Sequence, residues 1–222
     1  MIINIAIDGP AGAGKSTVAK AAAKELGYIY VDTGALYRAV GVNALREGLN
    51  TKDAQAITGS LEKITVELKF ENGSQQVYLN GSNVSEEIRT PAASMAASDV
   101  SAIPAVRSFL FDLQRDIAKH NNCIMDGRDI GTVVLPDARV KIFLTASPEV
   151  RAKRRYDELI AKGADVDFKK VLEELIERDY NDSHREIAPL KPAQDSVTVN
   201  TDDLSLEQSI NMVVSVIKEK LQ

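Results

Sequence analysis

The chain has 222 residues, of which 44% are hydrophobic and 27% are charged, and its formal net charge is −5. These proportions are typical of a folded globular protein. An acidic chain lacks the net basic surface that binding to long nucleic acids requires, so we expect no nucleic-acid partner. The single cysteine, Cys123, cannot form an intrachain disulfide, which excludes a secreted scaffold held by disulfides.

The sequence also argues against membrane insertion and secretion. No run of residues approaches the ~20 apolar positions of a membrane-spanning helix. Residues 1–7 lack the basic region of a signal peptide and lead directly into a glycine-rich motif, which indicates a first strand. We therefore expect a cytoplasmic protein with no membrane partner.

The first elements in chain order are typical of an α/β fold. Residues 2–7 are almost continuously apolar, as in a parallel strand buried on both faces, and Asp8-Gly9-Pro10 ends this strand. Helical periodicity follows over residues 15–26. A second short strand is predicted over 28–31, and further helices over 35–47 and 53–61.

Residues 64–84 have a different pattern. Apolar and polar residues alternate over 64–70, and the turn residues Glu71-Asn72-Gly73-Ser74 separate this run from residues 77–79. A second turn at Asn80-Gly81 leads to Val84. This pattern predicts a small antiparallel sheet inserted into the α/β chain, outside its main sheet.

The second half of the chain returns to an α/β pattern. A helix is predicted from Pro104 to about residue 119, and buried strands are predicted over 123–125, 140–144 and 196–199. Ser147-Pro148-Glu149 resembles a helix N-cap and first turn. Ser205 and Gln208 form a possible capping box for a final helix with an apolar stripe that extends to Leu221.

Residues 9–16 read GPAGAGKS and match the phosphate-binding pattern G-x-x-x-x-G-K-[ST] at every fixed position. Glycines let successive backbone N–H groups point at a phosphate, and the following helix adds its positive N-terminal end. Lys15 would neutralise phosphate charge and Ser16 would ligate Mg²⁺. The residues predicted to bind a nucleoside triphosphate are Gly9, Pro10, Ala11, Gly12, Ala13, Gly14, Lys15, Ser16 and Thr17. The alternative is a glycine-rich turn without a ligand.

This motif alone does not separate a kinase from a GTPase, a motor ATPase or a transporter subunit. The guanine-reading Asn/Thr-Lys-x-Asp pattern and the Leu-Ser-Gly-Gly-Gln signature are both absent from the sequence, which disfavours GTPases and ABC subunits. Three further segments concentrate polar residues, and we expect them at the carboxyl ends of parallel strands, where α/β proteins bind ligands. These segments are residues 32–38, 126–132 and 178–185.

In order and spacing, these segments and the phosphate-binding motif resemble bacterial cytidylate kinases over almost the whole chain. The resemblance implies a P-loop NTPase parallel sheet flanked by helices, a small β insert in the monophosphate-binding region and a short helical lid. It implies a core of residues 1–35, 104–147 and 164–222, a monophosphate-binding region of residues 36–103, and a lid of residues 148–163. The implied reaction is ATP- and Mg²⁺-dependent phosphorylation of CMP and dCMP.

The same resemblance assigns residue roles. Arg38 and Arg128 would bind the acceptor's phosphate, while Ser98, Arg107 and Asp129 would read the cytosine. A carboxylate suits the exocyclic amine of cytosine and would repel the carbonyl of uracil, which supports the role of Asp129 independently. Further substrate-binding positions are Thr33, Asp126, Arg178, Asp182 and Arg185.

Phosphoryl transfer between nucleotides needs no general base, because the second pKa of the acceptor's phosphate is about 6 and leaves it largely ionised. Catalysis then depends on stabilising charge on the transferred group. We expect this role for Mg²⁺ and for Lys15, Arg128, Arg155 and Arg178.

Several alternatives stay open from the sequence. Asp32 and Asp126 could cap helices or turns, and Arg151, Arg154 and Arg155 could form a solvated helix face. The acceptor could be UMP, AMP or a shikimate-like metabolite, or the chain could bind nucleotides without transferring phosphate. No helix has an obvious spare apolar face, so we expect a monomer.

Overall fold

The computed structural model describes residues 2–71 and 74–222, and its chain forms two compact units. The first unit contains residues 3–28 and 122–222, and the second contains residues 29–121. The helix Pro104–His120, which the sequence analysis assigned to the core, lies in the second unit. The functional division into core, monophosphate-binding region and lid stays a prediction. Asn72 and Gly73 of the expected turn lie outside the described residues.

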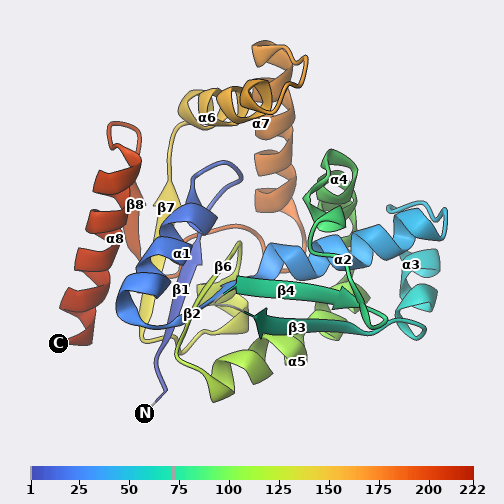
Figure 1. The fold of residues 1–222 in the computed structure, drawn as a ribbon, viewed down its shortest axis with the longest axis horizontal. Coiled ribbons are helices and arrows are strands. Elements are labelled where there is room, and N and C mark those ends of the chain that lie inside the picture. The colour runs from blue at the N-terminus through green and yellow to red at the C-terminus, as the bar shows by residue number, and fades with distance from the viewer. Residues whose placement is uncertain (1, 72–73) are drawn as a thin grey trace. The chain divides into compact units, whose positions relative to one another are not determined.

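Parallel strands form the centre of the first unit (Figure 1). β1 (Asn4–Asp8) pairs in parallel with β6 (Cys123–Gly127) and β7 (Val140–Thr145), and β7 pairs in parallel with β8 (Val197–Asn200). The strand order within the first unit is β6-β1-β7-β8, and β2 (Ile29–Asp32) is the first element of the second unit. The strand side chains Ile5 and Ile124 are fully buried, as their continuous apolar runs predicted. The predicted parallel sheet is confirmed.

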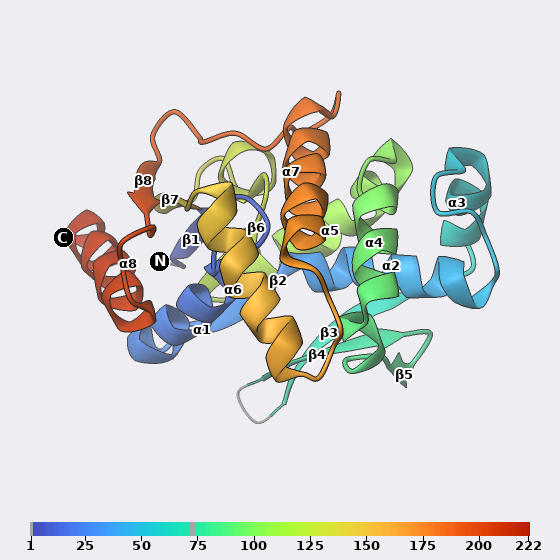
Figure 2. The same ribbon diagram turned by 90° about the horizontal axis from the view of Figure 1, so that it is seen from above.

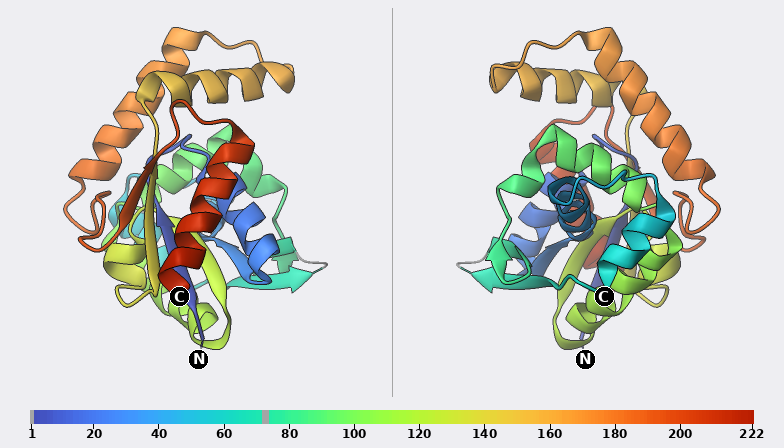
Figure 3. Two further views of the ribbon diagram at one scale, coloured as in Figure 1. Left: turned by 90° about the vertical axis from the view of Figure 1, so that its left-hand side faces the viewer. Right: turned by 90° about the vertical axis from the view of Figure 1, so that its right-hand side faces the viewer.

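Helices α1 (Lys15–Leu26) and α8 (Leu206–Leu221) pack against each other, and α8 also contacts β7 and β8 (Figure 3). The predicted capping box at the start of α8 is present, because Ser205 and Gln208 exchange hydrogen bonds between side chain and backbone. Cys123 is buried, and burial raises the pKa of its thiol to about 12, so this thiol is unreactive at neutral pH. No helix formed by residues 2–71 and 74–222 has both the length and the apolar character needed to cross a bilayer.

Helices α6 (Pro148–Ala161) and α7 (Phe168–His184) pack against each other (Figure 2). Their contact includes Ala152, Leu175 and an edge-to-face pair of Tyr156 and Phe168 with ring centroids 5.9 Å apart. Residues 178–185 were expected at the end of a strand, and this prediction is wrong. Residues 178–184 form the last two turns of α7, and Arg185 follows the helix as its C-cap. The helix continues through this polar segment because α7 is anchored earlier, by its N-cap Asp167 and by the core packing of Leu175.

The second unit is built around α2 (Thr33–Arg46), whose N-cap Asp32 accepts a hydrogen bond from Ala35 N. Its core also includes apolar residues of α3 (Ala54–Leu61), η1 (Glu87–Arg89), α4 (Pro91–Val100) and α5 (Pro104–His120). The predicted small antiparallel sheet is confirmed as β3 (Val66–Glu71), β4 (Ser74–Leu79) and β5 (Ser82–Asn83).

Candidate active site

The phosphate-binding loop connects β1 to α1, as the motif predicted. Gly9 has φ 150°, and a Cβ built on it would lie 1.9 Å from the carbonyl oxygen of Leu144, so only glycine fits beside β7. Lys15, at the start of α1, is buried, and its Nζ donates to the carbonyl oxygen of Pro10 at 2.7 Å. The ammonium group therefore lies against the loop, next to backbone N–H groups at a helix N-terminus, an arrangement that suits an anionic phosphate.

The surroundings of Lys15 disfavour its charged form. Burial and the neighbouring charge of Arg128 lower the pKa of Lys15 to about 7, and the charges of Asp126 and Asp8 only partly oppose this effect. Lys15 therefore gives up its proton more readily than a lysine in water does. A bound triphosphate would restore the charged form.

We expect ATP binding to take up a proton at Lys15. The phosphate charge raises the pKa of Lys15 above about 7, so the bound state holds more protons, and ATP affinity should fall as pH rises above about 7. Below about pH 6, this group should contribute no pH dependence. Calorimetric titration in buffers with different heats of ionisation should show a net uptake of protons at Lys15 when ATP binds at pH 7.

The matched control for this measurement is Lys15→Arg, because arginine stays charged throughout this pH range. On ATP binding, Lys15→Arg should take up fewer protons than the wild type, because the proton that Lys15 gains is missing. Equal uptake in the two proteins would mean that Lys15 is already fully charged before ATP binds.

Ser16 and Asp126 form an oxygen pair beside the loop. The register of β1 and β6 sets Ile7 opposite Asp126, and Ser16 Oγ donates to Asp126 Oδ2 at 2.8 Å. A hydroxyl and a carboxylate suit Mg²⁺, which uses few protein ligands together with phosphates and water. The described residues contain no cluster of three or more metal-binding side chains, so an ion at this pair would take its remaining ligands from the nucleotide and water. The residues present fit the expected magnesium ion.

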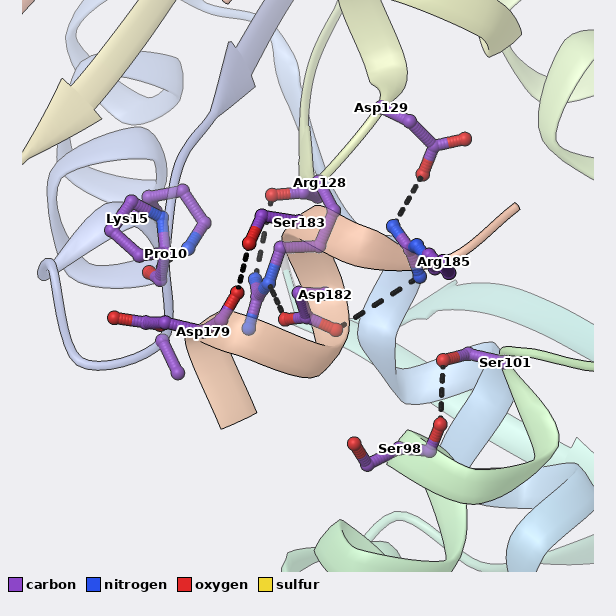
Figure 4. A network of polar contacts seen from close by, with 12 residues as sticks. Pro10, Lys15, Ser98, Ser101, Arg128, Asp129, Asp179, Asp182, Ser183 and Arg185 are labelled. Atoms are coloured by element: carbon purple, nitrogen blue, oxygen red, sulfur yellow. Dashed lines mark hydrogen bonds and ion pairs between the residues drawn. The ribbon is translucent and has the colours of Figure 1, made fainter. Parts of the chain in front are cut away.

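A network of alternating charges joins the end of β6 to the end of α7 (Figure 4). Arg128 Nε donates to Asp182 Oδ2 at 2.8 Å, although the two residues are 54 positions apart. Arg185 lies between two carboxylates, with Nη1 4.0 Å from Asp182 Oδ1 and Nη2 3.8 Å from Asp129 Oδ1. The structure thus brings together four of the predicted substrate-binding residues.

The arginines determine the charge state of this network. Burial alone would raise the pKa of Asp182, but the charges of Arg128, Arg178 and Arg185 outweigh burial and lower it. Asp182 is therefore ionised at neutral pH and orients the arginine groups around it. Oriented guanidinium groups are suited to binding phosphate oxygens through paired hydrogen bonds.

Asp8 is a buried carboxylate at the end of β1, and the sequence predicted no role for it beyond ending that strand. It accepts hydrogen bonds from the backbone N–H groups of Ile130 at 2.8 Å and Gly131 at 2.7 Å. Burial raises its pKa to about 6 against the effect of these two donors. Asp8 thereby connects the strand before the phosphate-binding loop to the turn that follows Asp129. A charged residue at the end of an otherwise apolar strand was the available sequence signal.

The three arginines of α6 have different environments. Arg151 is buried and bonded to protein acceptors, which rules out a solvated position for this residue. Arg154 donates to the carbonyl and hydroxyl oxygens of Thr201. Arg155 pairs with Glu158 at 2.9 Å, and its side chain is 39% exposed. The catalytic role of Arg155 stays a prediction.

The remaining predicted residues lie in the second unit. Arg38 pairs with Asp32 at 2.6 Å, so Asp32 both caps α2 and holds an arginine. Thr33 is buried in the first turn of α2. The guanidinium of Arg107 lies 5.7 Å from the centre of the Tyr37 ring. The remaining candidate, Ser98 on α4, accepts a hydrogen bond at its carbonyl oxygen from Ser101 (Figure 4). The roles of these four predicted residues in acceptor binding stay predictions.

Comparisons with known proteins give one consistent result. A family model described as Cytidylate kinase matches residues 5–219. A protein of Caldicellulosiruptor saccharolyticus named cytidylate kinase is 51% identical over 212 residues, which are 96% of this chain and 94% of that protein. A protein of Ligilactobacillus salivarius with the same name is 50% identical over 218 residues, 98% of this chain and 97% of that protein.

A solved structure of an uncharacterized protein from Eubacterium ventriosum resembles this one in fold alone, with a TM-score of 0.53 and 14% identity. The similarity covers 97% of this chain and 98% of that chain. The family match, by contrast, extends over nearly the whole sequence, including the phosphate-binding loop and the Arg128–Asp182 network. The chain therefore belongs to the cytidylate kinase family.

Proposed function

We propose that this protein transfers the γ-phosphoryl group of ATP to CMP and dCMP, forming the corresponding diphosphates. The observation that carries the proposal is the position of residues 126–129 at the end of β6, directly beside the strand that leads into the phosphate-binding loop. This placement brings a cationic group, Arg128, and a carboxylate, Asp129, to the same edge of the sheet as the ATP-binding motif. Membership in the cytidylate kinase family supports the same reaction.

On the donor side, the backbone of residues 9–17 holds the ATP phosphates and Lys15 neutralises their charge. Ser16 and Asp126 would hold Mg²⁺, which supplies electrostatic stabilisation of the phosphate oxygens when it is bound. Removal of water from this site strengthens each of these interactions.

On the acceptor side, Arg128 and Arg185 bind the monophosphate, and Arg178 and Asp182 lie at the sugar. Asp129 accepts a hydrogen bond from the exocyclic amine of cytosine. Thr33, Arg38, Ser98 and Arg107 are further proposed acceptor contacts from the second unit.

The chemical step is an in-line displacement. A phosphate oxygen of CMP forms a bond to the γ-phosphorus of ATP, the bond from that phosphorus to the β–γ bridging oxygen breaks, and ADP leaves with that oxygen. The attacking oxygen is already ionised, so the protein need not remove a proton. Lys15, Arg128, Arg155 and Arg178 stabilise the negative charge on the transferred group.

An assay of ADP release with CMP, dCMP, UMP, AMP, shikimate and no acceptor tests this proposal. We expect rapid release with CMP and dCMP and slow release without an acceptor. Preference for UMP, AMP or shikimate would identify a P-loop kinase for a different acceptor. ATP binding without ADP release under any condition would identify a nucleotide-binding module.

We also propose that the enzyme acts as a cytoplasmic monomer. The single cysteine, Cys123, is buried and free, so the chain cannot have the disulfide framework of small secreted proteins, which supports this location. Sedimentation equilibrium in the presence and absence of ATP and CMP tests the monomer, and a mass of twice 24.1 kDa would exclude it.

A further inference from the structure

Arg151 connects the phosphate-binding loop to the pair of helices α6 and α7. Its side chain is 3% exposed, and its three nitrogens bond to three different segments of the first unit. Nε donates to Ala146 O at 2.8 Å, Nη1 donates to Ala11 O at 2.9 Å, and Nη2 lies 2.6 Å from Asp179 Oδ2. A buried guanidinium group with this set of acceptors fixes their relative positions, because each acceptor would lose a partner if it moved.

The contact with Ala11 determines which way one peptide group of the loop faces. Because the peptide bond is planar and trans, its C=O and N–H groups point in opposite directions. The Ala11 carbonyl points at Arg151, so the N–H of Gly12 points away from Arg151. Phosphate-binding loops work through N–H groups directed at the phosphate, and a carbonyl oxygen in that direction would repel it.

Gly12 makes this orientation vulnerable. Its φ of 74° lies in a region that glycine occupies freely, so the Ala11–Gly12 peptide has access to a flipped orientation. The loop also packs closely on the two helices, because a Cβ built on Gly12 would lie 3.3 Å from Arg151 Cβ and 3.4 Å from Leu175 Cδ1. The bond from Arg151 therefore holds the flexible peptide in one of its orientations.

The contact with Asp179 extends this arrangement to α7. Asp179 follows Arg178 and lies one helical turn before Asp182, which bonds to Arg128. Arg151 thus anchors to the phosphate-binding loop the helix that carries two of the proposed substrate-binding residues, Arg178 and Asp182.

We propose that Arg151 is a positioning residue for phosphoryl transfer, which holds the Ala11–Gly12 peptide in its phosphate-binding orientation and aligns α7 with the loop. The predicted effect on kcat rests on the proposed function. The predicted effect on ADP affinity requires only that the loop binds a nucleotide. Arg151 acts through the backbone and through Asp179, and it does not contact the transferred phosphoryl group.

The experiment compares Arg151→Met, Arg151→Lys and Asp179→Asn by calorimetric titration with ADP and by steady-state kinetics with ATP and CMP. Arg151→Met should weaken ADP binding about 30-fold or more, because the Ala11 carbonyl loses its donor, and should also lower kcat. Arg151→Lys keeps the charge and part of the bonding, so its losses should be smaller. Asp179→Asn keeps the Ala11 contact, so it should lower kcat while ADP affinity stays within about threefold of the wild type.

A matched control is the exposed pair Lys153 and Asp157 on the same helix, whose side chains are 64% and 56% exposed. Lys153→Met and Asp157→Asn should leave ADP affinity and kcat unchanged. In the double variant of Arg151→Met with Asp179→Asn, the second change should add little to the first, because both remove the same ion pair.

Two outcomes would overturn the proposal. ADP affinity and kcat within twofold of the wild type in both Arg151 variants, with only a lower melting temperature, would make Arg151 a purely structural residue. Unchanged ADP affinity with a strongly lowered kcat in the Arg151 variants would indicate that Arg151 contacts the transferred phosphoryl group directly. If Arg151→Met does not fold, Arg151→Lys distinguishes these outcomes through smaller changes in ADP affinity and kcat. Failure of CMP as an acceptor would leave the ADP-binding result intact, so the two proposals fail separately.

Discussion

Replacement of Lys15 by methionine should lower kcat/KM for ATP by roughly 10³-fold, about 4 kcal/mol of transition-state stabilisation. Methionine has a similar length and keeps the packing, but it removes the only ammonium group bonded to the Pro10 carbonyl in the described part of the loop. The charge of the transferred phosphoryl group would then lose a donor in a buried site, where electrostatic interactions are strong. Steady-state kinetics with saturating CMP measure this loss.

The melting temperature separates this loss from unfolding. Burial lowers the pKa of Lys15 to about 7, so methionine at this position should leave stability unchanged or increased. Lys20→Met, at an exposed position on α1, is the control and should keep wild-type kinetics. A loss of less than tenfold in Lys15→Met would show that Lys15 is not essential to phosphoryl transfer.

Replacement of Asp129 by asparagine should lower kcat/KM for CMP by about 10²-fold or more and narrow the preference for CMP over UMP. Asp129 is buried, and its proposed partner is the exocyclic amine of cytosine. Asparagine keeps the shape of the side chain but adds an N–H donor, which removes the repulsion of the uracil carbonyl. Arg185 keeps its second carboxylate, Asp182, so the network around it should persist.

Competition between CMP and UMP in one reaction measures this change directly. Asp137→Asn, in the exposed segment before β7, is the matched control and should keep the wild-type preference. An unchanged ratio of CMP to UMP in Asp129→Asn would make Asp129 a structural partner of Arg185 and would assign base recognition to other residues.

Most of the secondary structure could be predicted from the sequence because its determinants are local. The apolar run before Gly9 and the motif of residues 9–16 predicted β1, the loop and α1, and helical periodicity gave the bounds of α1. Ser147, Ser205 and Gln208 formed the caps that their spacing indicated. Each of these signals depends on residues within about one turn of each other.

Two local features differ from a simple interpretation of the sequence. Residues 130–134, for which the sequence predicted no regular element, form a π-helical turn in which Leu135 N bonds to Ile130 O. Residues 178–184 continue a helix rather than follow a strand. In both places tertiary partners, Asp8 for the turn and Arg151 for α7, stabilise the observed conformation.

By itself, the sequence determined the α/β class and the phosphate-binding loop, because motif spacing and periodicity express these features locally. The acceptor contacts were expected from the resemblance to a family, and they stay predictions. Only the tertiary structure decided two long-range contacts. Asp8 accepts hydrogen bonds from Ile130 and Gly131, which are more than 120 positions away in the sequence, and Arg151 bonds to Ala11 across 140 positions. A buried charge takes whichever partners the packing of distant segments brings to it. No local pattern specifies those partners, so the contacts that orient the candidate site became visible only in the folded chain.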